Sequence, residues 1–149
     1  RVGYIVADEQ QVERIGRQRR LIDMQGDTVC EHALWELIDN GDMKRYLNRS
    51  LQIYQDRLGY LDNLIETYLK GKVTYQRPSG GLAVWLGLPH IKTSAQQLRE
   101  LLSTRGILIK HVHTDAHGNL GLRIGYASLT PQQMEALTVR LSILLAEGI

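Results

Sequence analysis

The feature of this sequence that most constrains its fold is a change of hydrophobic period near residue 72. From Asp42 to a stop at Gly71, large apolar residues recur at steps of three, four and seven, which is the period of a long helix with one buried face. After that point, residues 73–75 and 82–86 form short apolar runs separated by turn residues at 78–81, which is typical of strands. Together the two periods predict an α+β fold. The helical stripe consists of Met43, Leu47, Tyr54, Leu58, Leu61, Ile65 and Tyr68.

Cap signals place the other helices. Three residue pairs have the spacing of a capping box: Asp8 with Gln11, Ser94 with Gln97, and Thr130 with Gln133. Asp27 can begin a further helix, which Asn40 and Gly41 end. We therefore expect helices that start near residues 8, 27, 42, 94 and 130, the first ending at Gly26 and the fourth at Gly106. Strands are expected over residues 2–7, 73–75, 82–86, 107–112 and 120–127, with a turn at 115–119.

This order of elements predicts one sheet late in the chain. Residues 73–149 should form an antiparallel-rich sheet, with the helices near Ser94 and Thr130 packed on one of its faces. The strand at residues 2–7 stands apart from it, as if separated from a parent sheet. At 149 residues, the chain is long enough to bury roughly 70% of its unfolded surface, so it can fold without disulfides.

Composition limits the classes of partner. Eighteen Lys and Arg against sixteen Asp and Glu leave a net charge of +2, too small to indicate nucleic acid or a membrane surface by charge alone. Cys30 is the only cysteine, and no apolar run reaches the roughly eighteen residues of a membrane span. We expect a cytoplasmic protein. Because the chain begins at Arg1 without Met or a signal peptide, we interpret it as a piece of a longer protein.

Two polar clusters have less specific explanations. The basic run at residues 17–20 can contact phosphates, but the balanced net charge favours a solvated helix face. His111 and His113 alternate on a predicted strand, and Asp115 and His117 follow in the turn, which gives four candidate metal ligands. Structural zinc sites usually recruit thiolates, so a solvent-facing hairpin tip is favoured and no metal is expected. We find no self-contained catalytic set.

Arg123 is different because it lies inside an apolar strand. Alternation places it on one face with the small residues Gly125 and Ala127, which leave room around the guanidinium. Such a fork-shaped donor suits a carboxylate held by two parallel hydrogen bonds, although a buried structural ion pair would use the same geometry. The residues alone leave both explanations open. They assign Arg1 no role beyond that of a charged chain end.

Five segments follow one another in a distinctive order: RVGYIV at 1–6, IDMQGD at 22–27, NGDMKRY at 40–46, PSGGL at 78–82 and LRIGYAS at 122–128. With these segments, the whole chain resembles the C-terminal part of a fold-type-I aminotransferase. The Gln-Gly-Asp helix start and the Gly-Asp-x-x-Arg entry to the long helix are most similar to the MocR branch of GntR-type bacterial transcription regulators. Those proteins join a winged-helix DNA-binding domain to an aminotransferase-like domain that binds pyridoxal 5'-phosphate.

The resemblance implies roles for four residues. Arg1 matches the arginine that contacts the cofactor phosphate, and Arg123 matches the arginine that holds the α-carboxylate of an amino-acid ligand. Gly80 and Gly81 correspond to a Gly-rich segment near the ligand entrance. Tyr126 departs from the family pattern, in which Phe is common, and Met24 replaces a residue that is more often basic or polar.

The resemblance also implies what this chain lacks and how it is divided. The cofactor lysine, the aspartate that pairs with the pyridine nitrogen and the stacking aromatic belong upstream of Arg1, so no catalytic residue is assigned here. Residues 1–40 would end the large cofactor domain, 41–72 would be a connecting helix and 73–149 the small domain. The implied function is part of the effector domain of a dimeric regulator that senses an amino acid or amine. The alternative is the C-terminal part of a genuine aminotransferase.

Overall fold

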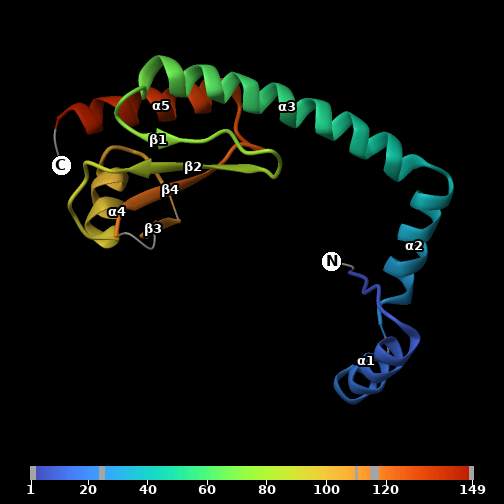
Figure 1. Cartoon of the computed structure of the whole chain (residues 1–149). Coiled ribbons are helices and arrows are strands. Elements are labelled where there is room, and N and C mark those ends of the chain that lie inside the picture. Colours follow the sequence, from blue (N-terminus) through green and yellow to red (C-terminus); the bar gives the residue numbers. More distant parts are fainter. Residues whose placement is uncertain (1–2, 24–25, 110, 115–117, 148–149) are drawn as a thin grey trace. The chain divides into compact units, whose positions relative to one another are not determined.

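The computed structural model describes residues 3–23, 26–109, 111–114 and 118–147 (Figure 1). The chain divides into two compact units, Arg1–Ser50 and Leu51–Ile149, and each is described by itself. The first unit holds helix α1 (Glu9–Ile22), helix α2 (Thr28–Asp39) and the start of helix α3 (Asp42–Tyr68). The second unit holds the rest of α3, strands β1 (Thr74–Tyr75), β2 (Ala83–Leu88), β3 (Val112–Thr114) and β4 (Leu120–Gly125), and helices α4 (Ala95–Thr104) and α5 (Pro131–Ala146).

The predicted caps form the helix starts. Ser94 and Thr130 make complete capping boxes with Gln97 and Gln133, and Pro131 occupies the first turn of α5. Asp8 and Asp27 each accept one hydrogen bond from the backbone three residues on. The predicted helix starts are therefore confirmed. The predicted end of the first helix at Gly26 was too late, because Asp23 is already extended, with φ −141°.

Two predicted strands were wrong. Residues 3–7 form no strand, because an extended segment becomes one only by pairing, and no strand in the described part of the chain pairs with it. The strand expected at 107–112 is instead β3, further along the chain. The Ile107 N–H is not available for strand pairing, because it donates to Leu102 O (2.9 Å) and closes the end of α4. Residues 115–117 of the expected turn lie outside the described residues.

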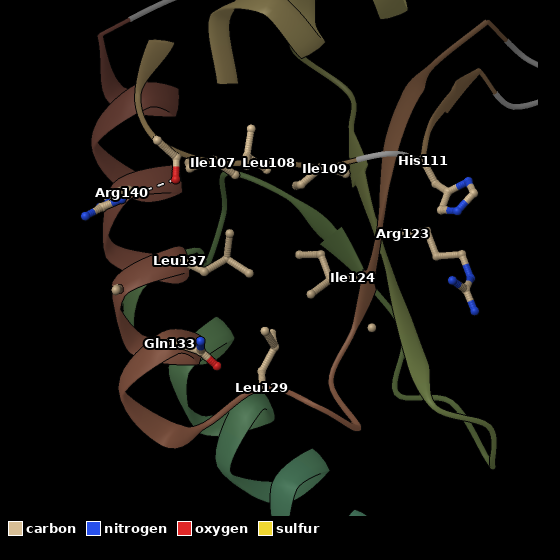
Figure 2. Close-up of a pocket in the computed structure, with 13 residues that line it drawn as sticks. Ile107, Leu108, Ile109, His111, Arg123, Ile124, Leu129, Gln133, Leu137 and Arg140 are labelled. Atoms are coloured by element: carbon tan, nitrogen blue, oxygen red, sulfur yellow. Dashed lines mark hydrogen bonds between the residues drawn. The ribbon is translucent and has the colours of Figure 1, made fainter. Parts of the chain in front are cut away.

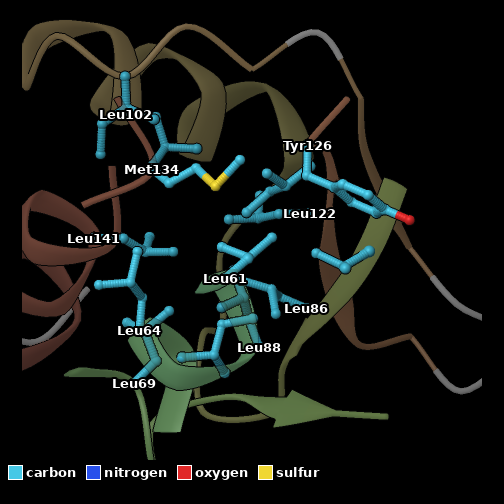
Figure 3. Close-up of a cluster of buried hydrophobic side chains, with 14 of the residues drawn as sticks. Leu61, Leu64, Leu69, Leu86, Leu88, Leu102, Leu122, Tyr126, Met134 and Leu141 are labelled. Atoms are coloured by element: carbon cyan, nitrogen blue, oxygen red, sulfur yellow. The ribbon is translucent and has the colours of Figure 1, made fainter. Parts of the chain in front are cut away.

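The sheet of the second unit has strand order β1-β2-β4-β3, and every neighbouring pair is antiparallel. Alternation gives it two different faces. One face buries side chains against α3, α4 and α5 in a single core, as Figure 3 shows. Its strand residues are Val84, Leu86, Leu88, Leu120, Leu122 and Ile124, all at most 4% exposed. The prediction of an antiparallel sheet with helices on one face is confirmed.

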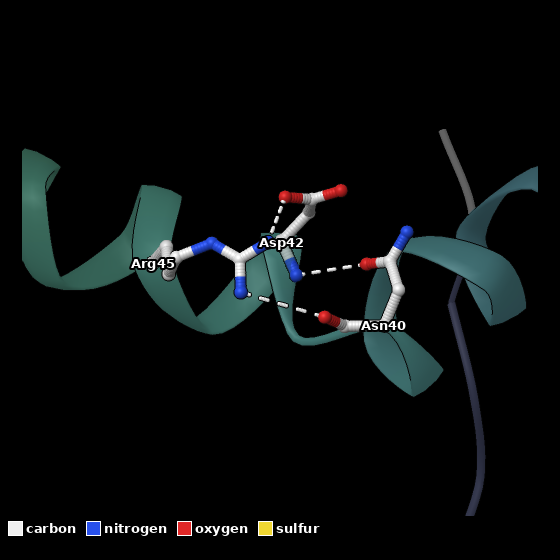
Figure 4. Close-up of polar contacts among 3 residues, drawn as sticks. All are labelled: Asn40, Asp42 and Arg45. Carbon is white, nitrogen blue, oxygen red and sulfur yellow. Dashed lines mark hydrogen bonds and ion pairs between the residues drawn. The ribbon is translucent and has the colours of Figure 1, made fainter.

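The corner between α2 and α3 carries the Gly-Asp-x-x-Arg motif (Figure 4). Gly41 adopts φ +76°, which glycine tolerates and larger residues avoid. The Asp42 N–H donates to Asn40 Oδ1 (2.9 Å), and the Arg45 guanidinium donates to Asp42 Oδ1 (2.5 Å) and to the Asn40 carbonyl (3.4 Å). The motif therefore closes the end of α2 and the beginning of α3. None of the described helices combines the length and apolarity that crossing a membrane requires.

Candidate functional site

Arg123 lies on the face of the sheet that the helices leave open. In β4 it is the register partner of Trp85 in β2, and its N–H donates to the His111 carbonyl (3.1 Å). Figure 2 shows Arg123 and His111 on one side of β4, with Ile124 and Leu137 on the other. The guanidinium is exposed, and no carboxylate among the described residues pairs with it. Among the described residues, Arg123 is therefore not part of a buried ion pair.

Three aromatic rings share this open face. Trp85 is 41% exposed and stacks with His113 at a centroid separation of 6.2 Å, and His113 stacks with His111 at 5.7 Å. Gly121 allows this arrangement, because an added Cβ would overlap the Trp85 indole. Sequence reasoning did not select Trp85 as a site residue. Alternation within β2 puts it on the face opposite Val84 and Leu86, but only the register with β4 sets it beside Arg123.

Gly80 and Gly81 lie in the turn that leads into β2. Gly81 adopts φ +92°, and its carbonyl accepts a hydrogen bond from the buried Tyr126 hydroxyl (2.6 Å). Gly80 lines a pocket of about 670 Å³ that Trp85 and Arg77 also line. Trp85 therefore borders both the pocket at this turn and, through the ladder, Arg123.

An acidic residue of α3 anchors the same turn. Asp62 accepts a hydrogen bond from the Tyr75 hydroxyl, and its Oδ2 lies 3.1 Å from Arg77 Nε, although not in hydrogen-bond geometry. Burial, followed by the hydrogen bond to Asp62, raises the pKa of Tyr75. Burial also raises the pKa of Tyr126, with Asp62 adding to the effect. Both phenols therefore remain hydrogen-bond donors at neutral pH.

A second pocket of about 510 Å³ lies between residues 106–109, the end of β4 and α5 (Figure 2). Its walls are mainly apolar and include Ile107, Leu129 and Leu137. Arg140 closes one side by donating to the Gly106 carbonyl (3.3 Å). Arg123 and His111 also line this pocket, so it adjoins the residue for which a ligand role is expected.

The remaining candidates are not brought into this site. Arg1, Asp115 and His117 lie outside the described residues. No group of three or more potential metal ligands occurs in the part of the chain that the structure describes, and His111 and His113 stack. In the basic run of α1, Arg17 pairs with Glu13 (3.0 Å) and Arg19 with Glu31 (3.8 Å), as expected of a solvated helix face.

Comparisons with known proteins agree with this architecture. The chain is 25% identical over 127 residues to the HTH-type transcriptional regulator NorG of Staphylococcus aureus, covering 85% of this chain and 29% of that protein. It is 21% identical over 89 residues to aromatic-amino-acid aminotransferase 1 of Thermococcus litoralis, covering 60% of this chain and 21% of that protein. The chain thus spans less than a third of either relative.

A solved structure shows the same fold. It is LysN, the α-aminoadipate aminotransferase of Thermus thermophilus, complexed with N-(5'-phosphopyridoxyl)-L-leucine. The TM-score is 0.77 at 21% identity, and the match covers 95% of this chain and 37% of that one. The model of the family described as aminotransferase class I and II matches residues 1–141. The chain therefore belongs to the class I and II aminotransferase family.

Proposed function

We propose that this chain is part of the aminotransferase-like effector domain of a MocR/GntR-type transcription regulator, to which it contributes Arg123 as the arginine for the ligand α-carboxylate. The observation that carries the proposal is the state of Arg123, which is exposed on an open sheet face without a carboxylate partner among the described residues. A planar donor with five N–H groups can hold a carboxylate by two parallel hydrogen bonds. The relative NorG, named as an HTH-type transcriptional regulator, supports the regulator assignment.

The proposed domain division of the chain is the one that the family resemblance implies. Residues 1–40 end the cofactor domain, residues 41–72 connect, and residues 73–149 form the small domain that carries Arg123. Gly80 and Gly81 would border the ligand entrance, where the anchored turn keeps side chains out of the way. The intact regulator would be a cytoplasmic homodimer that binds DNA through a domain outside this chain.

The implied cofactor is pyridoxal 5'-phosphate, which supplies an aldehyde that condenses with amines. The open face suits the carboxylate end of a ligand joined to it, because Arg123 is exposed there and Gly125, two residues along β4, carries no side chain. The phosphate would be contacted by Arg1. The residues that hold the ring and the aldehyde are expected upstream, so no reaction step is assigned to this chain.

The alternative is a genuine aminotransferase that uses the same arginine. The similarity to aromatic-amino-acid aminotransferase 1 favours it. An arginine that holds a ligand carboxylate serves sensing and transamination equally, so Arg123 does not distinguish the two functions. The segment upstream of this chain in the intact protein does. A winged-helix domain there, together with ligand-dependent DNA binding and no turnover, supports the regulator. Steady amino-group transfer would support the enzyme.

The test of Arg123 uses the intact protein that contains this chain. Arg123→Lys should weaken binding of an amino acid at least about tenfold while cofactor absorbance stays unchanged, because a lysine cannot reproduce the paired hydrogen bonds. Arg1→Ala should instead loosen the cofactor first. Arg99→Lys, an exposed exchange on α4, is the matched control and should change neither. Wild-type amino-acid affinity in folded Arg123→Lys protein would remove Arg123 from the site.

A further inference from the structure

The rings beside Arg123 form a continuous row across the open sheet face. Trp85 comes from β2, and His113 and His111 come from the β3 side, while the strand between them carries Arg123. The two contacts are close to parallel, with interplanar angles of 25° for Trp85 and His113 and 16° for His113 and His111. Because Gly121 has no side chain, the indole can cover the bare backbone of β4 and reach His113.

The charge on this face has one sign. The described residues of the four strands include no Asp or Glu, and Arg123 pairs with no carboxylate in the described part of the chain. The face therefore presents a free guanidinium next to flat, partly exposed rings. Its chemical complement is an anion that carries a flat ring, since aromatic rings attract one another in offset or edge-to-face contact and guanidinium groups bind carboxylates.

Space for such a ring exists beside Trp85. The indole forms one wall of the pocket of about 670 Å³ at the 78–80 turn, where Gly80 contributes no side chain. Tyr126 and Asp62 hold this region against the sheet and α3 through Gly81, Tyr75 and Arg77. A ligand whose carboxylate is on Arg123 can thus place its substituent along an anchored aromatic wall.

We infer that this face selects carboxylate ligands with an aromatic substituent, the carboxylate on Arg123 and the ring against Trp85 and His113. The inference rests on the proposed function, because it uses Arg123 as the carboxylate site, and it names the class of amino acid that this site takes. Aliphatic and acidic amino acids are expected to bind more weakly, since their side chains gain no ring contact.

Two simple acids with the same carbon skeleton test this preference on the full chain. Phenylacetate carries a flat ring and cyclohexylacetate a puckered saturated one, and both present the same carboxylate. Titrations followed by the NMR signals of the histidine rings should give phenylacetate about fivefold tighter binding. Trp85→Leu keeps an apolar residue at the wall and should remove that preference. Trp35→Leu is the matched control, because Trp35 also stacks on a histidine, His32 at 5.4 Å, but belongs to α2.

Arg123→Gln separates this inference from the proposed function. If Arg123→Gln weakens the binding of both acids, and the wild type binds phenylacetate more tightly than cyclohexylacetate, the carboxylate role of Arg123 and the aromatic preference are both supported. If Arg123→Gln weakens the binding of both acids, but the wild type binds the two acids equally, the aromatic preference is overturned and the carboxylate role of Arg123 is still supported. If Arg123→Gln changes neither affinity, or if the wild type binds neither acid, the carboxylate role fails and the inference fails with it. Unchanged thermal unfolding of each variant shows that it is folded.

Discussion

Among single residues, Tyr126 makes the hydrogen bond that connects the Gly80–Gly81 turn to the end of β4. Tyr126 is 2% exposed, and its hydroxyl donates to the Gly81 carbonyl at 2.6 Å. Tyr126→Phe keeps the ring but leaves that carbonyl without this donor, so the unfolding free energy should fall by about 1–2 kcal/mol. Chemical denaturation of both proteins measures the difference. Tyr60→Phe on α3 is the control, because Tyr60 is 37% exposed and its hydroxyl makes no hydrogen bond to the described residues; its unfolding free energy should stay within about 0.5 kcal/mol of the wild type.

The same variant also tests the ligand entrance. If the hydroxyl positions the turn, Tyr126→Phe should raise protease or hydrogen-exchange sensitivity at residues 78–82 more than elsewhere in the second unit. Equal protection of that turn in the two proteins would show that the anchor formed by Asp62, Tyr75 and Arg77 is sufficient.

Part of the candidate site was predictable from residues because it depends on local alternation. Arg123 was placed on the face with Gly125 because strand side chains alternate, and the structure agrees. Trp85 was not predictable in the same way. Its place beside Arg123 comes from the register of two strands that are 32 residues or more apart in sequence, and one residue of slip would put it with the core. The hydroxyl contact of Tyr126 likewise depends on a turn distant in sequence.

At the scale of elements, two glycines on the same face of β4 give a matched pair. An added Cβ at Gly121 would overlap the Trp85 indole, whereas at Gly125 its nearest neighbour is the Leu82 carbonyl at an ordinary 3.8 Å. Gly121→Ala should therefore displace the indole and cost about 1–3 kcal/mol of unfolding free energy, while Gly125→Ala should cost less than about 1 kcal/mol. Denaturation gives the energies, and the chemical shifts of His113 report the indole. Similar costs for both would contradict the packing of Trp85 on Gly121.

The elements also show where sequence patterns succeed. Helix starts were predictable at Ser94 and Thr130 because capping is local, and the long period of α3 was predictable because its buried face repeats over many turns. Strand positions were less so. The apolar run at 107–109 has the composition of a strand. In the structure, however, the turn at Gly106 and the hydrogen bond from the Ile107 N–H to the Leu102 carbonyl connect it to the end of α4. Pairing partners, not composition, decided where β3 lies.

At the scale of the whole molecule, the two units differ in how they bury apolar residues. The second unit has a core of leucines from α3, α4, α5 and the sheet. The described helices α1 and α2 bury no residue, and large apolar side chains such as Tyr4, Ile22 and Trp35 are exposed. Every buried apolar residue in the described part of the chain belongs to the second unit, and apolar burial is the main stabilising term in folding. Arg123 lies in this better packed unit.

The isolated chain is not expected to capture the implied cofactor covalently. Mixed with pyridoxal 5'-phosphate, the purified chain should form no stoichiometric lysine adduct that survives dialysis and should transfer no amino group. Condensation needs a neutral amine, and the Glu66 carboxylate raises the pKa of Lys70, which keeps it protonated. Lys72 is engaged by Ser142, through Oγ at 2.7 Å and the carbonyl at 3.1 Å. The other lysines are Lys44, Lys92 and Lys110.

Absorbance after dialysis and peptide mapping after borohydride reduction measure the outcome, with the intact protein as the positive control. Scattered, substoichiometric labelling of several lysines is expected at high cofactor concentration, since exposed amines react without a site. A single lysine labelled at one equivalent would contradict the prediction and would place a cofactor-binding amine in this chain. The described strands contain no lysine, so such a lysine would lie in a helix or a loop.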